Sequence, residues 1–231
     1  MTVQSVIPPI LFWVSFFSSA TVWAQQSRDS LDYSLNKEIP QVIRPVVLET
    51  LENYPELRET HIQFVFDDQI FNVFMQARPD FFTLLLPREK RRYTIQMLPF
   101  MVLDNKKIPL ETLPKEVLKG WLSHELGHIV DYVNRSSLNL IGFGAMYFLS
   151  PAFVERAERR ADIYAIQHGF GNSIIATKDY ILSQSSLPLA YRQKIQKLYM
   201  SSEEVLKIIQ KGEEKAGKEI KKKEQPIKGG D

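Results

Sequence analysis

The apolar pattern from residue 112 to residue 133 constrains the fold more than any other feature of this 231-residue chain. Its apolar residues recur at helical spacing, which predicts one long amphipathic helix. The middle of this helix reads His124-Glu125-Leu126-Gly127-His128. Because residues four apart lie on one face of a helix, the imidazoles of His124 and His128 can reach the same ion, and Glu125, rotated by about 100°, leans over it. The pattern therefore predicts one half of a metal site.

The other half of such a site must come from elsewhere in the chain. Catalytic zinc sites use three protein ligands and a water molecule, and a chain without cysteine offers only histidine and carboxylate groups. After His128, a second predicted helix carries Glu158 and, one turn later on the same face, Asp162. We expect Glu158 to be the third ligand. We expect Asp162 to form a hydrogen bond with the outer nitrogen of a ligand histidine and so to fix its tautomer.

Two assignments near these residues stay open. Asp131, three residues after His128, is either a partner of a ligand or an ordinary surface acid. The whole pattern also has a plainer interpretation, in which the histidines are half exposed and Glu158 forms an ion pair with a nearby arginine. The arginines next to Glu158 are Arg156, Arg159 and Arg160.

The residue that would stabilise an oxyanion also stays open. Side chains near enough in sequence are Tyr132, Tyr147, Tyr164 and His168, and none of them is singled out.

These residues carry a family resemblance. The motif from His124 to His128, followed by Glu158-x-x-Ala161-Asp162, resembles the signature of gluzincin zinc metallopeptidases, especially the group that contains HtpX and the CAAX prenyl proteases. The resemblance covers residues 112–170, and because the chain lacks the multiple transmembrane helices of those enzymes, it is closer to their compact soluble relatives. The resemblance implies an α+β, zincin-like (minigluzincin) fold, Zn²⁺ held by His124, His128 and Glu158, and Glu125 as catalytic base.

Strand-like segments come before the metal-binding pattern, and helical segments come after it. Runs rich in β-branched and aromatic residues predict a small antiparallel or mixed sheet from residues 61–66, 72–77, 81–86 and 93–98. Helices are expected at residues 40–53, 150–169, 173–183 and 187–200. By the family resemblance, the strand before the metal-binding helix is a sheet edge that docks an extended peptide. Its matching residues are Tyr93, Thr94, Ile95 and Gln96, and the alternative is an interior strand.

The two ends of the chain differ in composition from its middle. Residues 1–24 carry no charged side chain and end in Val22-Trp23-Ala24, which predicts a cleaved signal peptide and an exported, periplasmic or secreted protein. The alternative is an uncleaved segment that anchors the chain in a membrane. We expect residues 25–39 to be a linker, residues 40–205 to form the zincin-like metallopeptidase domain, and residues 206–231 to be a charged, partly disordered tail.

An uncharged apolar stretch from residue 138 to residue 154 joins the two predicted ligand helices. It is at the lower length limit for crossing a bilayer, and Gly142, Gly144, Ser150 and Pro151 interrupt it. We interpret it first as a buried or pocket-lining loop. The second interpretation is peripheral contact with a membrane through residues 138–154.

The charge balance narrows the class of partner. A formal net charge of +2 gives no indication of a nucleic-acid partner.

Taken together, the metal-binding pattern and the family resemblance predict a zinc-dependent endopeptidase that acts on a peptide or protein substrate, with Glu125 as general base for a zinc-activated water. The alternative is a catalytically inactive, zinc-bearing binding or scaffold protein of the cell envelope.

Overall fold

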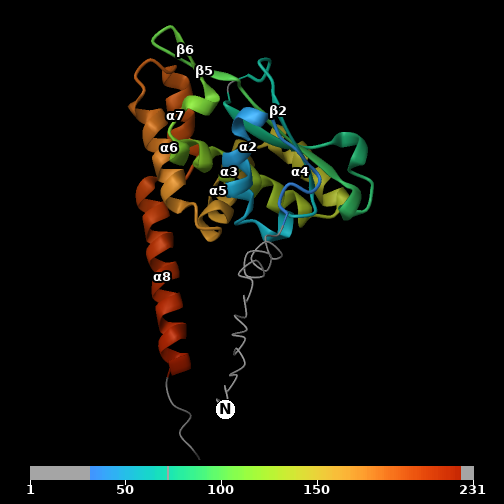
Figure 1. Ribbon diagram of the computed structural model, residues 1–231, viewed down its shortest axis with the longest axis vertical. Coiled ribbons are helices and arrows are strands. Elements are labelled where there is room, and N and C mark those ends of the chain that lie inside the picture. The colour runs from blue at the N-terminus through green and yellow to red at the C-terminus, as the bar shows by residue number, and fades with distance from the viewer. Residues whose placement is uncertain (1–31, 72, 225–231) are drawn as a thin grey trace, which may run out of the picture. The chain divides into compact units, whose positions relative to one another are not determined.

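A four-stranded sheet forms one layer of the computed structural model, which describes residues 32–71 and 73–224 (Figure 1). Its strands lie in the order β1-β2-β4-β3, with β4 parallel to β2 and antiparallel to β3. A separate hairpin consists of β5 and β6. The strands are β1 (Lys37–Glu38), β2 (His61–Phe66), β3 (Met75–Pro79), β4 (Arg92–Met97), β5 (Phe100–Leu103) and β6 (Lys106–Pro109).

The helices make up the rest of the described chain, and together with the sheet they confirm a mixed α+β architecture. The α-helices are α2 (Arg44–Leu51), α3 (Lys115–Val133), α4 (Ser137–Leu149), α5 (Pro151–Gln167), α6 (Gly171–Ser183), α7 (Leu189–Leu198) and α8 (Ser202–Glu224). Short 3₁₀ helices are η1 (Gln41–Ile43), η2 (Pro55–Leu57), η3 (Phe81–Thr83), η4 (Arg88–Lys90) and η5 (Leu110–Thr112).

The predicted edge strand is an interior strand. Tyr93, Thr94, Ile95 and Gln96 lie in β4, which pairs with β2 on one side and with β3 on the other. Side chains of β4 are buried on both faces, since Ile95, Gln96 and Met97 are consecutive buried residues. A strand that is covered on both faces and paired on both sides offers no free edge to a peptide. The sheet edge next to β4 is β3.

Two other strand predictions differ from the structure. Residues 81–86 do not form a strand, because Asp80 accepts a hydrogen bond from the amide of Phe82 and starts the 3₁₀ helix η3. The predicted strand 72–77 is displaced towards its carboxyl end, as β3. The β5–β6 hairpin was missed, although Asp104 and Asn105 both adopt positive φ in its two-residue turn, a conformation that these residue types tolerate.

Part of the predicted linker belongs to the fold. Residues 25–31 and the predicted signal peptide, residues 1–24, lie outside the described residues. Lys37 and Glu38, however, form β1, which pairs in parallel with β2. The buried Lys37 ammonium donates hydrogen bonds to the carbonyls of Leu35, Arg58 and Thr60, so this short strand is fixed by a side chain as well as by its ladder.

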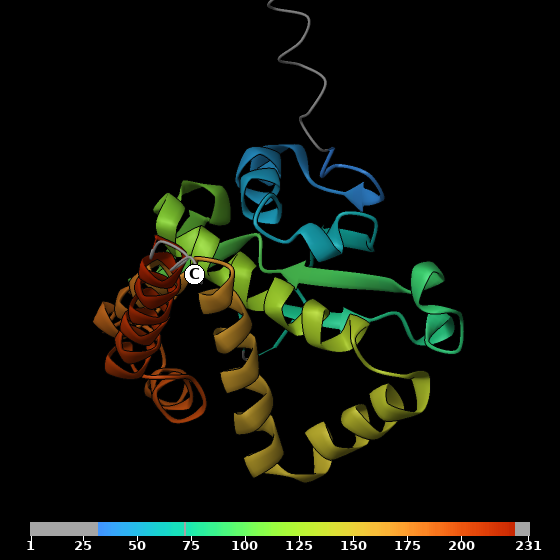
Figure 2. The same ribbon diagram turned by 90° about the horizontal axis from the view of Figure 1, so that it is seen from below.

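Helix α3 is the centre of the helical part. It contacts β3, α2, α5 and α6, and Figure 2 shows it running along the sheet with α5 crossing beside it. Because neighbours surround it, nearly every residue from Val117 to Tyr132 is buried, including both histidines. Two glycines allow this crowding. A Cβ on Gly127 would lie 2.5 Å from the carbonyl oxygen of Ala161 in α5, and one on Gly120 would lie 2.2 Å from that of Ser173 in α6.

The stretch predicted as a loop, residues 138–154, is instead two helices. Ser136 accepts a hydrogen bond from the amide of Asn139 and starts α4, and Ser150 caps the start of α5 in the same way. The glycines that suggested a loop lie within α4, where nothing stands within 4 Å of a Cβ added at Gly142 or Gly144. The predicted end of α5 is confirmed, with Gly169 at a φ of +87°.

The predicted tail begins as packed structure. Helix α8 continues to Glu224, and its first turns lie against α6, where Ile209 and Val205 face Gly171. The domain therefore extends beyond residue 205, and residues 225–231 lie outside the described part. Across the residues that the structure describes, no helix is long and apolar enough to cross a membrane.

A capping box at the start of α8 yields a testable prediction. The amide of Ser201 donates to the Glu204 carboxylate at 2.7 Å, the amide of Glu204 donates to the Ser201 hydroxyl, and Glu204 also pairs with Arg159 of α5. The ion pair with Arg159 is the largest cause that lowers the Glu204 pKa to about 2. A lowered carboxyl pKa adds stability above the unfolded pKa of about 4.3, and this stability is lost as pH falls towards 2.

We therefore expect Glu204→Gln to lower the free energy of unfolding at pH 7 by about 0.2–1 kcal/mol, because both partners are partly exposed and solvent screens them. Near pH 2 the difference from wild type should have largely disappeared. Urea unfolding at both pH values measures this. Glu204→Ala, which also removes the acceptor of the Ser201 amide, should be less stable than Glu204→Gln. Equal stabilities of Glu204→Gln and wild type at pH 7 would contradict the prediction.

Candidate metal centre

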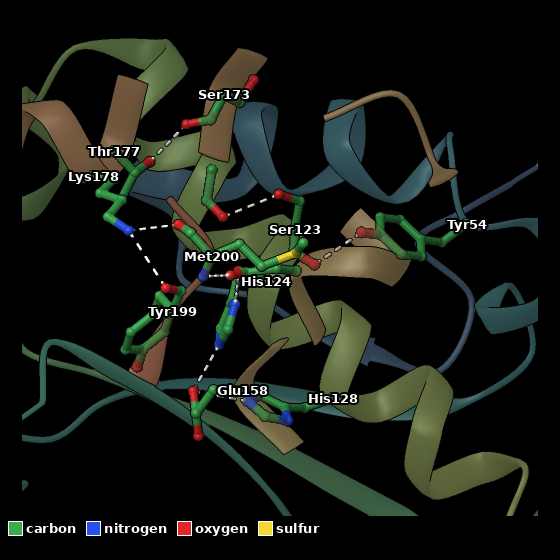
Figure 3. Close-up of polar contacts among 12 residues, drawn as sticks. Tyr54, Ser123, His124, His128, Glu158, Ser173, Thr177, Lys178, Tyr199 and Met200 are labelled. Atoms are coloured by element: carbon green, nitrogen blue, oxygen red, sulfur yellow. Dashed lines mark hydrogen bonds and ion pairs between the residues drawn. The ribbon is translucent and has the colours of Figure 1, made fainter. Parts of the chain in front are cut away.

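Helices α3 and α5 bring three of the predicted site residues to one point. The His124 Nε2 atom lies 3.1 Å from the Glu158 Oε2 atom, and the His128 Nε2 atom lies 3.5 Å from the same oxygen (Figure 3). One ligand atom from each of the three residues falls within 4.8 Å of the other two. All three side chains are buried. Two histidines and a glutamate that lies thirty or more positions further along the chain thus form one cluster, as the sequence predicted.

The donor set and spacing of this cluster fit a metal ion. Ligand bonds of about 2.0–2.2 Å in a tetrahedral zinc site place neighbouring ligand atoms about 3.4 Å apart. The two distances between imidazole nitrogen and carboxylate oxygen, 3.1 and 3.5 Å, lie on either side of that value. Two neutral imidazoles and one carboxylate are also a common ligand set for transition metals. His124, His128 and Glu158 can therefore hold a metal ion.

Asp162 orients one of these ligands, as predicted. Its Oδ1 atom lies 2.8 Å from the Nδ1 atom of His124, which leaves the Nε2 atom of that ring directed at Glu158. The Oδ2 atom of Asp162 accepts a hydrogen bond from the Met200 amide at 3.0 Å. The buried ammonium of Lys178 in α6 in turn donates to the Met200 carbonyl (Figure 3). These successive hydrogen bonds hold the His124 imidazole in its orientation from the side of its Nδ1 atom.

Charges in the cluster shift two pKa values in opposite directions. Burial lowers the pKa of His124, but hydrogen bonds with Asp162 and Glu158 outweigh burial and leave that pKa well above its usual value. Burial raises the pKa of Glu158, yet the charge of His128 and hydrogen bonds with both histidines bring it well below its usual value. Without an ion, the site therefore favours an ionised Glu158 carboxylate beside a protonated His124 imidazole.

Glu125 lies beside the cluster and faces the same cavity. Its Oε2 atom accepts a hydrogen bond from the Ala77 amide of β3 at 2.6 Å. Burial, as the largest cause, raises the Glu125 pKa, although the nearby histidines act against this. A cavity of about 310 Å³ is lined by Glu125, His128 and Glu158 together with residues of β3 and α4. A buried carboxylate with a raised pKa suits proton transfer near neutral pH.

Three tyrosines surround this cavity. The Tyr147 hydroxyl donates to the Glu158 Oε1 atom at 2.6 Å, and the Tyr132 hydroxyl donates to the Ala77 carbonyl at 3.4 Å. The Tyr199 ring lies 5.1 Å from the His124 ring. Burial raises the pKa of all three hydroxyls, so they stay protonated and able to donate hydrogen bonds.

Sequence reasoning identified two of these tyrosines and missed the third. Tyr132 and Tyr147 were candidates, whereas Tyr199 follows α7, far along the chain from both ligand helices, and nothing in its neighbouring sequence marks it. Of the other two candidates, His168 stacks on Tyr54 and bonds to Glu56. Tyr164 is not among the residues that line the cavity.

The alternative interpretation, with half-exposed histidines and an ion pair between Glu158 and a nearby arginine, is wrong. Both histidines are buried, and the polar partners of Glu158 are these histidines and Tyr147. The neighbouring arginines have other partners, because Arg159 pairs with Glu204 and Arg160 pairs with Asp131. Asp131 is buried and also binds Arg135, and its ion pair with Arg160 links α3 to α5.

Comparison of the chain with protein-family models, with curated proteins and with solved structures found no match in any of the three.

Proposed function

We propose that this chain is a zinc-dependent endopeptidase with a zincin-like fold of the compact gluzincin kind. One observation carries the proposal: a buried group of two imidazoles and a carboxylate has the right spacing for a metal ion, and two of its members, His128 and Glu158, line one cavity together with a second acidic group, Glu125. A metal site with a purely structural role needs no additional buried acid beside its ligands. Glu125 therefore favours a hydrolytic function over a structural one.

In the proposed enzyme, His124, His128 and Glu158 hold the zinc ion. Bound zinc supplies a Lewis acid that polarises a carbonyl and lowers the pKa of a bound water to about 7. Glu125 takes a proton from the attacking water and passes it to the leaving amine. The Ala77 amide holds the Glu125 carboxylate in place for this transfer. The Tyr199 hydroxyl, which is protonated and lines the cavity, is placed to donate a hydrogen bond to a developing oxyanion, whereas the Tyr147 hydroxyl donates to Glu158.

The proposed substrate is a peptide in extended conformation. Strand β3 pairs with β4 on one side, and its residues from Met75 to Pro79 line the cavity that contains Glu125 and Glu158. Strand addition to such an edge binds main-chain groups and selects weakly among side chains. We further propose that the chain is exported, on the basis of the apolar residues 1–24.

Metal content and chelation test this proposal together. We expect about one zinc per chain by elemental analysis, and cleavage of casein that a chelator stops and added zinc restores. Glu158→Ala should lose more metal affinity than the roughly 10–100-fold that removal of an outer partner costs. Glu155→Ala, which makes the same change one turn earlier in α5, is the matched control and should keep both metal and activity.

The outcomes separate the two candidate functions. A wild-type chain that holds zinc fully but cleaves nothing would favour the binding or scaffold protein. A wild-type chain without metal, or a Glu158→Ala variant that holds zinc as well as wild type does, would contradict the proposed site.

A further inference from the structure

The most exposed large apolar side chains of the described residues gather in two segments. Six of the seven whose exposure is 75% or more belong to the loop that follows β3 or to α4, and Phe71 is the seventh. They are Phe81 (75%), Phe82 (91%) and Leu85 (76%) in the loop, and Leu138 (81%), Phe148 (91%) and Leu149 (78%) in α4. Single exposed apolar residues are ordinary, but such a concentration marks an interaction surface.

Helix α4 lacks the polar outer face of an ordinary surface helix. It carries no charged side chain, and only Leu140 and Phe143 of its thirteen residues are buried. Ile141, Met146 and Tyr147 add to its exposed apolar area. A helix in contact with water normally presents charged and polar groups on its outer side. The outer side of α4 is therefore suited to an apolar environment.

A buried arginine joins the two segments. The Arg91 guanidinium donates to the Leu86 carbonyl at 3.3 Å in the loop, to the Arg135 carbonyl at 2.8 Å, and to the Ser137 hydroxyl at 3.0 Å in the first turn of α4. In Figures 1 and 2 the loop and α4 lie on the side of the molecule away from α7. The two groups of apolar side chains therefore belong to one surface.

Exposed cations border this surface. Arg88, Lys90 and Arg92 are exposed in the segment that follows Leu86, against one acid, Glu89. Aromatic and leucine side chains next to lysine and arginine are the composition with which proteins enter the boundary between lipid headgroups and acyl chains. Aromatic rings favour that depth, and the cations attract anionic headgroups.

We propose that Phe81, Phe82, Leu85, Leu86 and the outer side of α4 form a docking surface for an anionic lipid bilayer. The docked chain lies on the membrane and does not cross it. Phe148 and Gly144 of α4 also line the cavity that contains Glu158, so docking brings the rim of this cavity to the membrane surface. The docking surface requires neither metal nor catalysis, so its failure and the failure of the proposed peptidase are separate results.

The absence of cysteine makes a local test direct. Single variants Phe82→Cys and Phe148→Cys of the full chain can each be labelled with an environment-sensitive fluorophore. Leu189→Cys in α7, at an apolar site that is 61% exposed on the other side of the molecule, is the control. Because each label reports only its own position, binding through residues 1–24 does not obscure the result. Circular dichroism of each variant checks that the fold is kept.

We expect the labels at positions 82 and 148 to shift to shorter emission wavelength with phosphatidylglycerol-containing vesicles and to be quenched by brominated lipid. The label at position 189 should do neither. A further variant combines Phe82→Cys with Arg88→Gln and Lys90→Gln. Because each cation near an anionic surface strengthens binding about fivefold, the vesicle concentration that gives half of the maximal emission shift should rise on the order of 20-fold in this variant.

Several results would overturn the proposal. These are unchanged emission at both positions 82 and 148, an equal shift at position 189, and the same half-maximal concentration after removal of the two cations. A shift that appears without vesicles as protein concentration rises would assign the surface to contact between two copies of the chain instead.

Discussion

Glu125→Gln should lower kcat/KM for peptide hydrolysis by roughly 10²–10⁴-fold while the metal content stays at the wild-type level. Glutamine has nearly the shape of glutamate, and its side-chain oxygen can still accept the hydrogen bond of the Ala77 amide. It has no basic carboxylate, however, and cannot take a proton from water. The variant therefore loses proton transfer and keeps the hydrogen bond with the Ala77 amide. Cleavage of a fluorogenic peptide and elemental analysis of the same preparation measure the two quantities.

Glu111→Gln is the matched control for this change, because Glu111 is exposed in η5. It should leave both activity and metal content unaltered. If Glu125→Gln hydrolysed the peptide at the wild-type rate, Glu125 would not be the base. If the variant lost its metal, the result would assign Glu125 a role in binding the ion.

Gly127→Ala should lower the free energy of unfolding by about 1–3 kcal/mol, the usual cost of overfilling a packed interior. The added Cβ would lie 2.5 Å from the Ala161 carbonyl oxygen, which belongs to the backbone of α5 and cannot rotate away. Alanine favours a helix over glycine by about 1 kcal/mol, so the clash must outweigh this gain. Helix α5 must then move away from α3, and because it carries Glu158, metal affinity should fall as well.

Thermal unfolding with and without zinc, together with zinc titration, tests both parts of this prediction. Gly212→Ala makes the same substitution within α8, where nothing stands within 4 Å of the new Cβ. It should keep or slightly raise stability, because only the helix preference acts there. A Gly127→Ala chain as stable as Gly212→Ala would show that the two helices can separate at little cost.

Local sequence patterns were sufficient to predict that His124, His128 and Glu158 form one cluster. Helical spacing placed His124 and His128 on one face of α3, and the same spacing of four placed Glu158 and Asp162 on one face of α5. Both facts depend on short stretches of chain. The contact between Asp162 and His124 follows once the two helices cross, and it was predicted from the same spacing.

Features that depend on distant parts of the chain were not predicted. Strand β4 became an interior strand because β3, which precedes it in the sequence, takes the outer position beside it, and neither strand's own residues encode that order. Tyr199 reaches the site because α7 folds back over α5, a long-range contact without a local signal. The error at α4 has another cause, since its glycines and lack of charge resemble a loop, while its caps at Ser136 and Ser150 define a helix.

The hydrogen bond between the Met200 amide and Asp162 has a consequence for biosynthesis. All three residues of the candidate metal cluster leave the ribosome before Met200 does. A nascent chain thus presents both ligand helices while one oxygen of Asp162 still lacks its amide partner. The orientation of the His124 ring is completed only after α7 has emerged and docked, so the cluster acquires its final geometry after Met200 has left the ribosome.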